Sequence, residues 1–126
     1  MTMSQPIEPV ILDPAMIDQM ATLERLGKTG ITARLANLYL DNSAALMDTV
    51  AVAARAGDQD ALRRAFHSLK STSATLGANA FAARCGEHES AARHGTLRLE
   101  SPMLDELAGM YAAVRSAVAA LAGRGG

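Results

Sequence analysis

The segment 61–78 constrains the fold most, because its apolar residues recur at three- and four-residue intervals. Such spacing is typical of an amphipathic α-helix, in which successive residues lie about 100° apart around the axis. On this helix His67 falls almost opposite the apolar side, with two arginines one turn before it and Lys70 one turn after it. We therefore expect His67 to face solvent. The side expected to face the core comprises Leu62, Ala65, Phe66, Leu69, Thr72, Ser73 and Leu76.

The composition favours a protein built of helices alone. Apolar residues make up 49% of the 126 residues, whereas aromatic residues make up only 3%. Alanine and leucine dominate the apolar set, and both favour helices, whereas strands are enriched in β-branched and aromatic residues. A chain of this length has room for one domain with a single core. The sequence therefore predicts one all-α domain.

Capping residues and glycines divide the chain into five predicted helices. Asp13-Pro14 and Ser101-Pro102 are typical of helix starts, with the first residue as N-cap and proline at the first helical position. Asp58 is a third N-cap, and Gly77 is typical of a helix end. Because the Gly57-Asp58 connection is short, the helices on either side of it are expected to pack antiparallel. The predicted helices are 14–26, 31–56, 59–76, 80–94 (with Asn79 at its start) and 102–122.

Four of these helices are long and amphipathic, and they predict an antiparallel up-down four-helix bundle with an additional short N-terminal helix. The bundle is expected over 13–122, after an N-terminal arm (1–12) and before a flexible tail (123–126). The short helix either caps one end of the bundle or offers Met16 and Met20 to a partner, since methionine adapts to varied surfaces. The inward stripe of the second helix is predicted to be Ile31, Leu35, Leu38, Ala45, Leu46, Thr49 and Ala53.

The fourth predicted helix carries two of the three histidines. Its inward stripe is Phe81, Cys85, His88 and Ala92. A histidine on an apolar stripe is more often a buried, hydrogen-bonded residue than a catalytic one, so we expect this of His88. His94 stands near the end of the helix, where the helix dipole favours a basic side chain, and is expected at the surface.

The surroundings of His67 suit the binding of a phosphoryl group. Neutral imidazole is nucleophilic, and its ordinary pKa near 6.5 leaves much of it neutral at cellular pH. Arg63, Arg64 and Lys70 lie at helical spacing from His67. Lysine and arginine donate charge-assisted hydrogen bonds to phosphoryl oxygens. The sequence therefore makes these residues candidates for one site.

The helical hairpin adds two more candidates. If the chain turns near Ala78, His67 lies eleven residues before the turn and Glu89 eleven after it, so the two are level along the bundle. Arg93 lies one helical turn further, about 5.4 Å along the axis. Glu89 or Arg93 then either orients the imidazole and extends the phosphate-binding patch, or the two form an ordinary surface ion pair at i,i+4 spacing.

The residues around His67 resemble the histidine-containing phosphotransfer (HPt) family. The family pattern His-x-Leu-Lys-Gly-Ser/Ala-Ser/Ala, followed by Leu-Gly, stands here as His67-Ser68-Leu69-Lys70-Ser71-Thr72-Ser73-Ala74-Thr75-Leu76-Gly77. The resemblance implies that His67 is phosphorylated, on Nε2 by the family's habit, with Lys70 as its electrostatic partner. Ser71 replaces the usual glycine, and its side chain either crowds an approaching partner or donates its hydroxyl to the phosphoryl group. The resemblance spans about 12–121 and also favours core positions for Cys85 and His88, where the family often has cysteine and leucine.

By this resemblance the chain is expected to be a phosphorelay intermediate. His67 would take a phosphoryl group from an aspartyl phosphate on the receiver domain of a hybrid sensor kinase and pass it to the receiver of a response regulator. The receiver would bring Mg²⁺, and this chain would bind no cofactor. The sequence has neither nucleotide-binding glycine-rich pattern, Gly-x-x-x-x-Gly-Lys-Ser/Thr or Gly-x-Gly-x-x-Gly. We therefore expect a phosphocarrier without kinase activity of its own.

Two alternatives belong to other classes. A bundle that binds receivers or other partners without being phosphorylated has the same fold, and the change at Ser71 favours it slightly. A metal-bearing bundle would need Glu-x-x-His pairs, and none of the three histidines has an acidic residue three positions before it.

Charge and composition limit partners and location. A net charge of −1 does not favour nucleic acid, and no apolar run reaches the length of a membrane span. The single cysteine and an amino terminus without signal-peptide features predict a cytoplasmic protein, and we expect a monomer.

Overall fold

Five α-helices make up the part of the chain that the computed structural model describes, residues 11–124, and no strand occurs among them. Each begins and ends close to a cap or glycine that the sequence marks. Asp13 caps the first helix through its side chain, and Asp58 caps the third in the same way. The helices are α1 Pro14–Arg25, α2 Ile31–Ala56, α3 Gln59–Thr75, α4 Asn79–Arg93 and α5 Ser101–Arg124.

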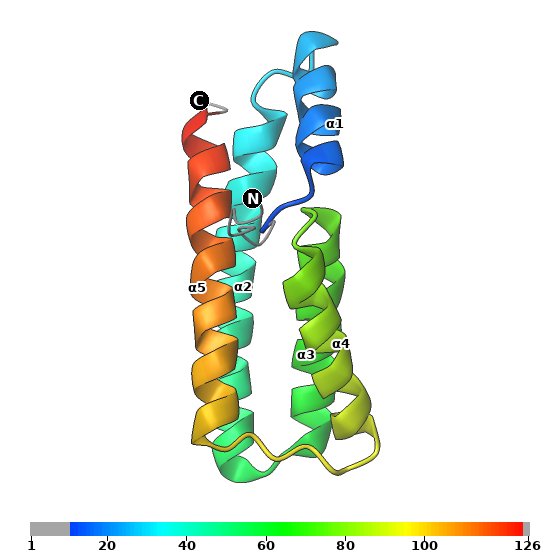
Figure 1. Cartoon of the computed structure of the whole chain (residues 1–126), viewed down its shortest axis with the longest axis vertical. Helices are drawn as coiled ribbons and strands as arrows, with labels where there is room; N and C mark the ends of the chain where they lie inside the picture. Colours follow the sequence, from blue (N-terminus) through cyan, green and yellow to red (C-terminus); the bar gives the residue numbers. More distant parts are fainter. Residues whose placement is uncertain (1–10, 125–126) are drawn as a thin grey trace, which may run out of the picture.

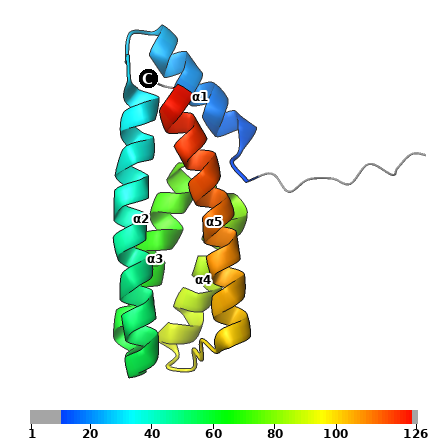
Figure 2. The same ribbon diagram turned by 90° about the vertical axis from the view of Figure 1, so that its left-hand side faces the viewer.

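The two longest helices set the length of the molecule. With 26 residues α2 is about 39 Å long, whereas α3, with 17, is about 26 Å long. The antiparallel hairpin of α3 and α4 therefore covers only part of α2 and α5, and α1 lies beyond its end (Figure 1). Figure 2 shows α1 running obliquely beside the upper ends of α2 and α5. The predicted all-α, up-down four-helix bundle with a short N-terminal helix is confirmed.

The turn between α3 and α4 holds α1 in place. The backbone N–H of Asp13 donates to the carbonyl of Gly77 at 2.9 Å. Gly77 has φ +78°, and a Cβ added there would lie 3.0 Å from Asp13 Cβ, so both backbone conformation and space require glycine. Met16 is buried in the core and Met20 is half-buried against it. The short helix thus caps the α3–α4 hairpin, and the hypothesis that Met16 is displayed to a partner is wrong.

Six predicted helix boundaries differ from the structure by one or two residues. Helices α1, α3 and α4 end one residue earlier than predicted, at Arg25, Thr75 and Arg93. The fourth helix begins at Asn79 itself, with Ala78 in the N-cap position. The last helix begins at Ser101 and runs through Gly123 to Arg124, two residues beyond its predicted end. The predicted arm and tail lie mostly outside the described residues; of the arm, Leu12 is part of the buried core.

The inward face of α2 is not the predicted one. Its buried residues are Ala36, Tyr39, Ser43, Val50 and Ala53, so the core face is rotated by about one residue over most of the helix, and the predicted Ala45 and Thr49 are exposed. Leu38, predicted to be inside, is 51% exposed. The buried face includes two residues with hydroxyl groups, Tyr39 and Ser43, which the predicted stripe omits. Their hydroxyls lie 2.8 Å from those of Ser73 and Tyr111, so they are buried without losing hydrogen bonds.

The other predicted core positions are confirmed. On α3 six of the seven predicted inward residues are buried and Thr72 is half-buried. On α4 the whole predicted stripe is buried, and burial raises the pKa of the Cys85 thiol to about 12, so it is an inert core residue.

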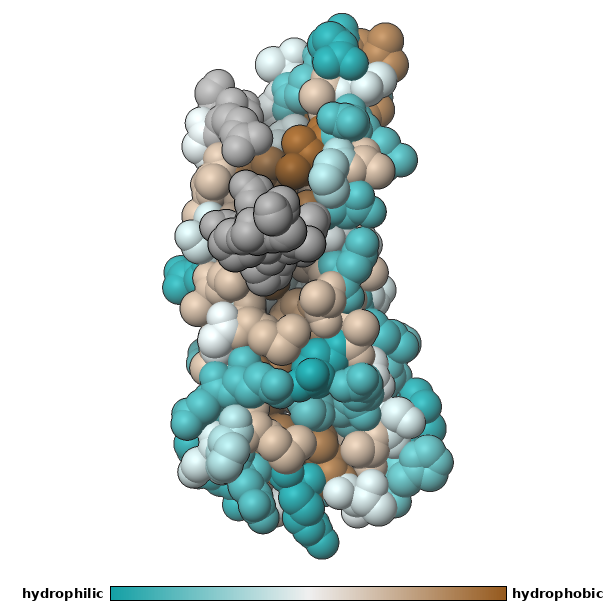
Figure 3. Space-filling view, viewed as in Figure 1, coloured by the Kyte–Doolittle hydropathy of each residue, from teal (hydrophilic) through white to brown (hydrophobic). Residues whose placement is uncertain are grey.

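Much of the lower half of the face drawn in Figure 3 is hydrophilic. Within the described residues, no helix is both long enough and apolar enough to span a bilayer.

Candidate functional site

His67 points away from the core on the middle of α3. Its side chain is 61% exposed, although the neighbouring Phe66 is completely buried. The buried side of α3 packs against both α2 and α4, so the exposed ring is carried by a helix that is fixed along its length. This confirms the predicted orientation of His67.

A buried carboxylate on α4 joins the exposed ring to two cations. Glu89 Oε2 lies 2.9 Å from His67 Nδ1 and accepts a 2.8 Å hydrogen bond from Arg93, while Glu89 Oε1 lies 2.7 Å from Lys70 Nζ. The Glu89 side chain is only 3% exposed. We call these four residues the Glu89 cluster. The Glu89–Arg93 contact exists, but it is not an ordinary surface pair, because the carboxylate is buried and bound from three sides.

The cluster fixes the charge of Glu89. The hydrogen bond from Lys70 lowers the pKa of Glu89 most, burial opposes this, and the hydrogen bond from His67 lowers it further. Glu89 is therefore a carboxylate at neutral pH, and a carboxylate only accepts hydrogen bonds. In neutral His67 the proton must consequently sit on Nδ1. The lone pair is then on Nε2, the ring nitrogen on the side away from Glu89.

The three remaining predicted residues lie outside this cluster. Arg63 and Arg64 both pair with Asp60, at 3.0 and 2.8 Å, on the preceding turn of α3. The hydrogen bond from Arg63 is the main reason that the pKa of Asp60 is lowered. Ser71 is exposed one turn beyond His67. Of the seven predicted site residues the structure thus brings together His67, Lys70, Glu89 and Arg93.

Sequence reasoning missed Gly86, which lies in α4 one turn before Glu89. A Cβ added to Gly86 would lie 3.1 Å from Lys70 Cδ. The available signal was the glycine itself, because an isolated glycine inside a helix costs about 1 kcal/mol relative to alanine and often marks a close approach.

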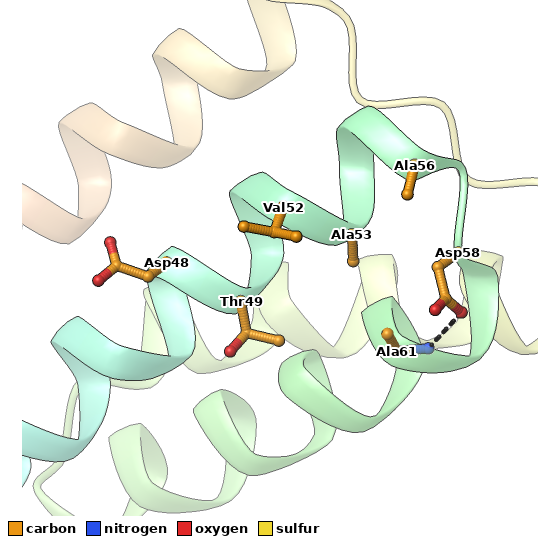
Figure 4. Close-up of a pocket in the computed structure, with 7 residues that line it drawn as sticks. All are labelled: Asp48, Thr49, Val52, Ala53, Ala56, Asp58 and Ala61. Carbon is orange, nitrogen blue, oxygen red and sulfur yellow. Dashed lines mark hydrogen bonds between the residues drawn. The ribbon is translucent and has the colours of Figure 1, made fainter.

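A hollow lies where α2 ends and α3 begins (Figure 4), and its side chains are less suited to catalysis than those of the Glu89 cluster. The Asp58 carboxylate in it accepts a hydrogen bond from the backbone of Ala61 at 3.0 Å and so serves as a helix cap. The Thr49 hydroxyl is bonded to the carbonyl of Ala45. The hollow contains no histidine or cation, and is lined by Asp48, Thr49, Val52, Ala53, Ala56, Asp58 and Ala61. Across residues 11–124, no group of three or more His, Cys, Asp or Glu side chains could hold a metal ion.

A helical bundle that displays one histidine beside a lysine and a buried carboxylate has the layout of a phosphotransfer protein, and the comparisons agree. The family model for the Hpt domain matches residues 34–117, so the chain belongs to the Hpt domain family. It is a histidine phosphotransfer protein of phosphorelay signalling, a class that interacts with receiver domains of kinases and response regulators.

One solved structure is closely similar. It is the crystal structure of histidine-containing phosphotransfer protein B (HptB) from Pseudomonas aeruginosa PAO1, with a TM-score of 0.78 and 26% sequence identity. The match covers 93% of this chain and 98% of that one. A comparison with curated protein sequences finds no match.

The other two histidines differ from His67. His94 is exposed, and its Nδ1 lies 2.8 Å from the Ser90 carbonyl, as expected of a surface residue. His88 is buried against Phe66, with ring centroids 5.0 Å apart and the ring planes tilted by 50°. Its burial was predicted correctly, but the expected hydrogen bonding is wrong for Nε2, which has no partner among the described residues.

The unpaired ring of His88 makes stability sensitive to acid. Burial lowers the pKa of His88, and nearby Arg84 lowers it further. Below about pH 6.5 the unfolded chain therefore binds a proton that the folded chain does not, and stability falls as the pH falls. His88→Leu is expected to flatten this dependence between pH 7 and 5 and to raise the free energy of unfolding by about 1–3 kcal/mol, the cost of an unsatisfied polar group. Urea denaturation across this pH range measures both effects, and parallel pH curves for the two proteins would contradict the prediction.

Proposed function

We propose that His67 is the phosphorylated residue and that the Glu89 cluster prepares it for transfer. The observation that carries this proposal is the hydrogen bond from Nδ1 to the buried Glu89 carboxylate. It holds the ring in one orientation and leaves the Nε2 lone pair directed to solvent, where an incoming receiver can meet it.

The transfer needs little from this chain beyond a placed nucleophile. Nε2 donates its lone pair to the phosphorus of a receiver's aspartyl phosphate, the P–N bond forms, and the P–O bond to the aspartate breaks. The aspartate leaves as a carboxylate with the electron pair. As Nε2 becomes bonded to phosphorus the ring gains positive charge, which the Glu89 carboxylate stabilises through Nδ1–H. Transfer to a second receiver reverses these steps.

Lys70 and Arg93 are the cations nearest to the transferred group. Both remain about half exposed, and each has N–H groups beyond those bound to Glu89, so each can donate to phosphoryl oxygens while it stays bound to the buried carboxylate. Arg63 and Arg64 lie one turn before His67. Their pairs with Asp60 are exposed and contribute little to stability, so exchange onto a phosphoryl group costs little. Ser71 adds a hydroxyl at the edge of this surface.

We infer that the donor is the receiver domain of a hybrid sensor kinase and the acceptor that of a response regulator. One exposed ring on a rigid helix can meet two receivers in turn. The Mg²⁺ that offsets phosphoryl charge is expected to come with the receiver. The protein is expected to act as a cytoplasmic monomer that carries phosphate without kinase activity of its own.

The test is to mix the protein with phosphorylated receivers from the same source and to locate the label. We expect an acid-labile, base-stable label, and peptide mapping at alkaline pH should place it on His67. A label on another residue, or none from the full panel of receivers, would overturn the proposal in favour of a bundle that only binds its partners.

Replacing Glu89 with glutamine tests the proposed role of the cluster. The amide keeps the size of the side chain but removes its charge and allows the ring to adopt the other tautomer. A hydrogen bond to a charged group is worth about 1.5–3 kcal/mol, so transfer should slow by about tenfold or more. The matched control is Glu87→Gln, which changes an exposed carboxylate of the same helix that pairs with Arg84. Equal rates of transfer in the two variants would show that Glu89 does not act on His67.

A further inference from the structure

Lys70 reaches the Glu89 carboxylate by crossing the backbone of α4 at Gly86. A Cβ built on Gly86 would lie 3.1 Å from Cδ and 4.0 Å from Cγ of Lys70. The Nζ atom of the same side chain ends 2.7 Å from Glu89 Oε1, one helical turn further along α4. The alkyl chain of Lys70 therefore occupies the space in which a side chain at position 86 would begin.

The backbone of α4 does not itself call for glycine at this position. Gly86 is not among the glycines with positive φ, so its conformation is open to any residue. Glycine is also among the least favourable residues in the interior of a helix. Gly109 of α5 provides the contrast, because a Cβ added there meets nothing within 4 Å. What distinguishes Gly86 from Gly109 is the lysine that lies against it.

We propose that Gly86 is a positioning residue for phosphoryl transfer: its missing side chain lets Lys70 lie across α4 and sets where the ammonium stands beside His67. This inference rests on the proposed role of His67 and Lys70. A new Cβ obliges Cδ to shift by a few tenths of an ångström, and because Nζ is bound to Glu89, that shift strains the ion pair. A larger side chain at position 86 fills this space and turns Lys70 toward solvent.

The experiment compares Gly86→Ala and Gly86→Leu with Gly109→Ala and Gly109→Leu. The first measurement is the rate of phosphoryl transfer from a phosphorylated receiver. Gly86→Leu and Lys70→Ala are each expected to slow transfer by about tenfold, which corresponds to the loss of one charge-assisted hydrogen bond. Gly86→Ala should lie between this variant and the wild type. Both Gly109 variants should transfer at the wild-type rate.

A double variant separates positioning from general damage. If Gly86 acts through Lys70, Gly86→Leu should slow transfer no further once Lys70 is already alanine. An additive loss in the double variant would overturn the proposal, as would an unchanged rate in Gly86→Leu alone. Circular dichroism and thermal melts establish that each variant is folded, and Gly86→Ala tests the same contact with the smallest possible addition.

A second readout does not depend on phosphorylation. The carboxyl carbon of Glu89 can be titrated by NMR in each protein. Since Lys70 is the main cause of the lowered pKa of Glu89, Gly86→Leu and Lys70→Ala should both raise that pKa, whereas Gly109→Leu should not. If wild-type protein takes no label, the proposed function fails, but this titration still decides whether Gly86 places Lys70. If label appears on His67 while the titration and the rate are unmoved by Gly86→Leu, only the inference about Gly86 fails.

Discussion

His67→Gln is expected to remove all phosphoryl label from the protein after incubation with a phosphorylated receiver. The amide of glutamine has no lone pair of comparable nucleophilicity, so the P–N bond cannot form. The position is exposed, and the glutamine amide can still donate a hydrogen bond to the Glu89 carboxylate, so the free energy of unfolding should change little. The variant should therefore keep its helical circular dichroism and its melting behaviour. Loss of the label would then be due to removal of the nucleophile and not to unfolding.

The other histidines provide matched controls for this result. His94→Gln changes an exposed residue at the end of α4, and His88→Gln changes a buried one that lies outside the Glu89 cluster. Both should retain the label at wild-type extent. If label persists in His67→Gln, or disappears from a folded His88→Gln or His94→Gln, the assignment of the phosphorylated residue is wrong.

The part of the site that lies within one helix could be predicted from the sequence. His67 and Lys70 are three residues apart, and the strongly apolar Leu62, Phe66 and Leu69 define which side of α3 is buried. Glu89 could be placed level with His67 because a tight turn at Gly77 fixes the register of the hairpin. Local periodicity and one short connection were enough for these positions.

What could not be predicted depends on contacts between helices. No pattern in the sequence indicates that the Glu89 carboxylate is buried, or that Lys70 of α3 binds it from the neighbouring helix. The orientation of α2 was wrong for the same reason: the hydroxyl of Tyr39 finds a partner on another helix. Hydropathy assigns a residue to a side by its own polarity, whereas burial of a polar group is decided by the partner it meets.

Leu69→Ala is expected to lower the free energy of unfolding by about 2–5 kcal/mol, the range for a buried leucine that leaves a cavity. Leu69 lies on α3 between His67 and Lys70 in sequence, and its side chain is completely buried. Such a loss is a large part of the about 5–15 kcal/mol that stabilises a typical domain. Equilibrium urea denaturation monitored by circular dichroism measures it.

Leu38→Ala is the matched control, because it removes the same atoms from a leucine that is half exposed on α2. It should cost less than about 1 kcal/mol. The two substitutions also separate stability from chemistry, since neither residue belongs to the Glu89 cluster. At a temperature where Leu69→Ala is mostly folded, its transfer rate should fall only in proportion to the unfolded fraction. A larger stability loss in Leu38→Ala than in Leu69→Ala would mean that the core faces of α2 and α3 are assigned the wrong way round. A drop in transfer beyond the unfolded fraction would mean that packing beneath α3 controls the placement of His67.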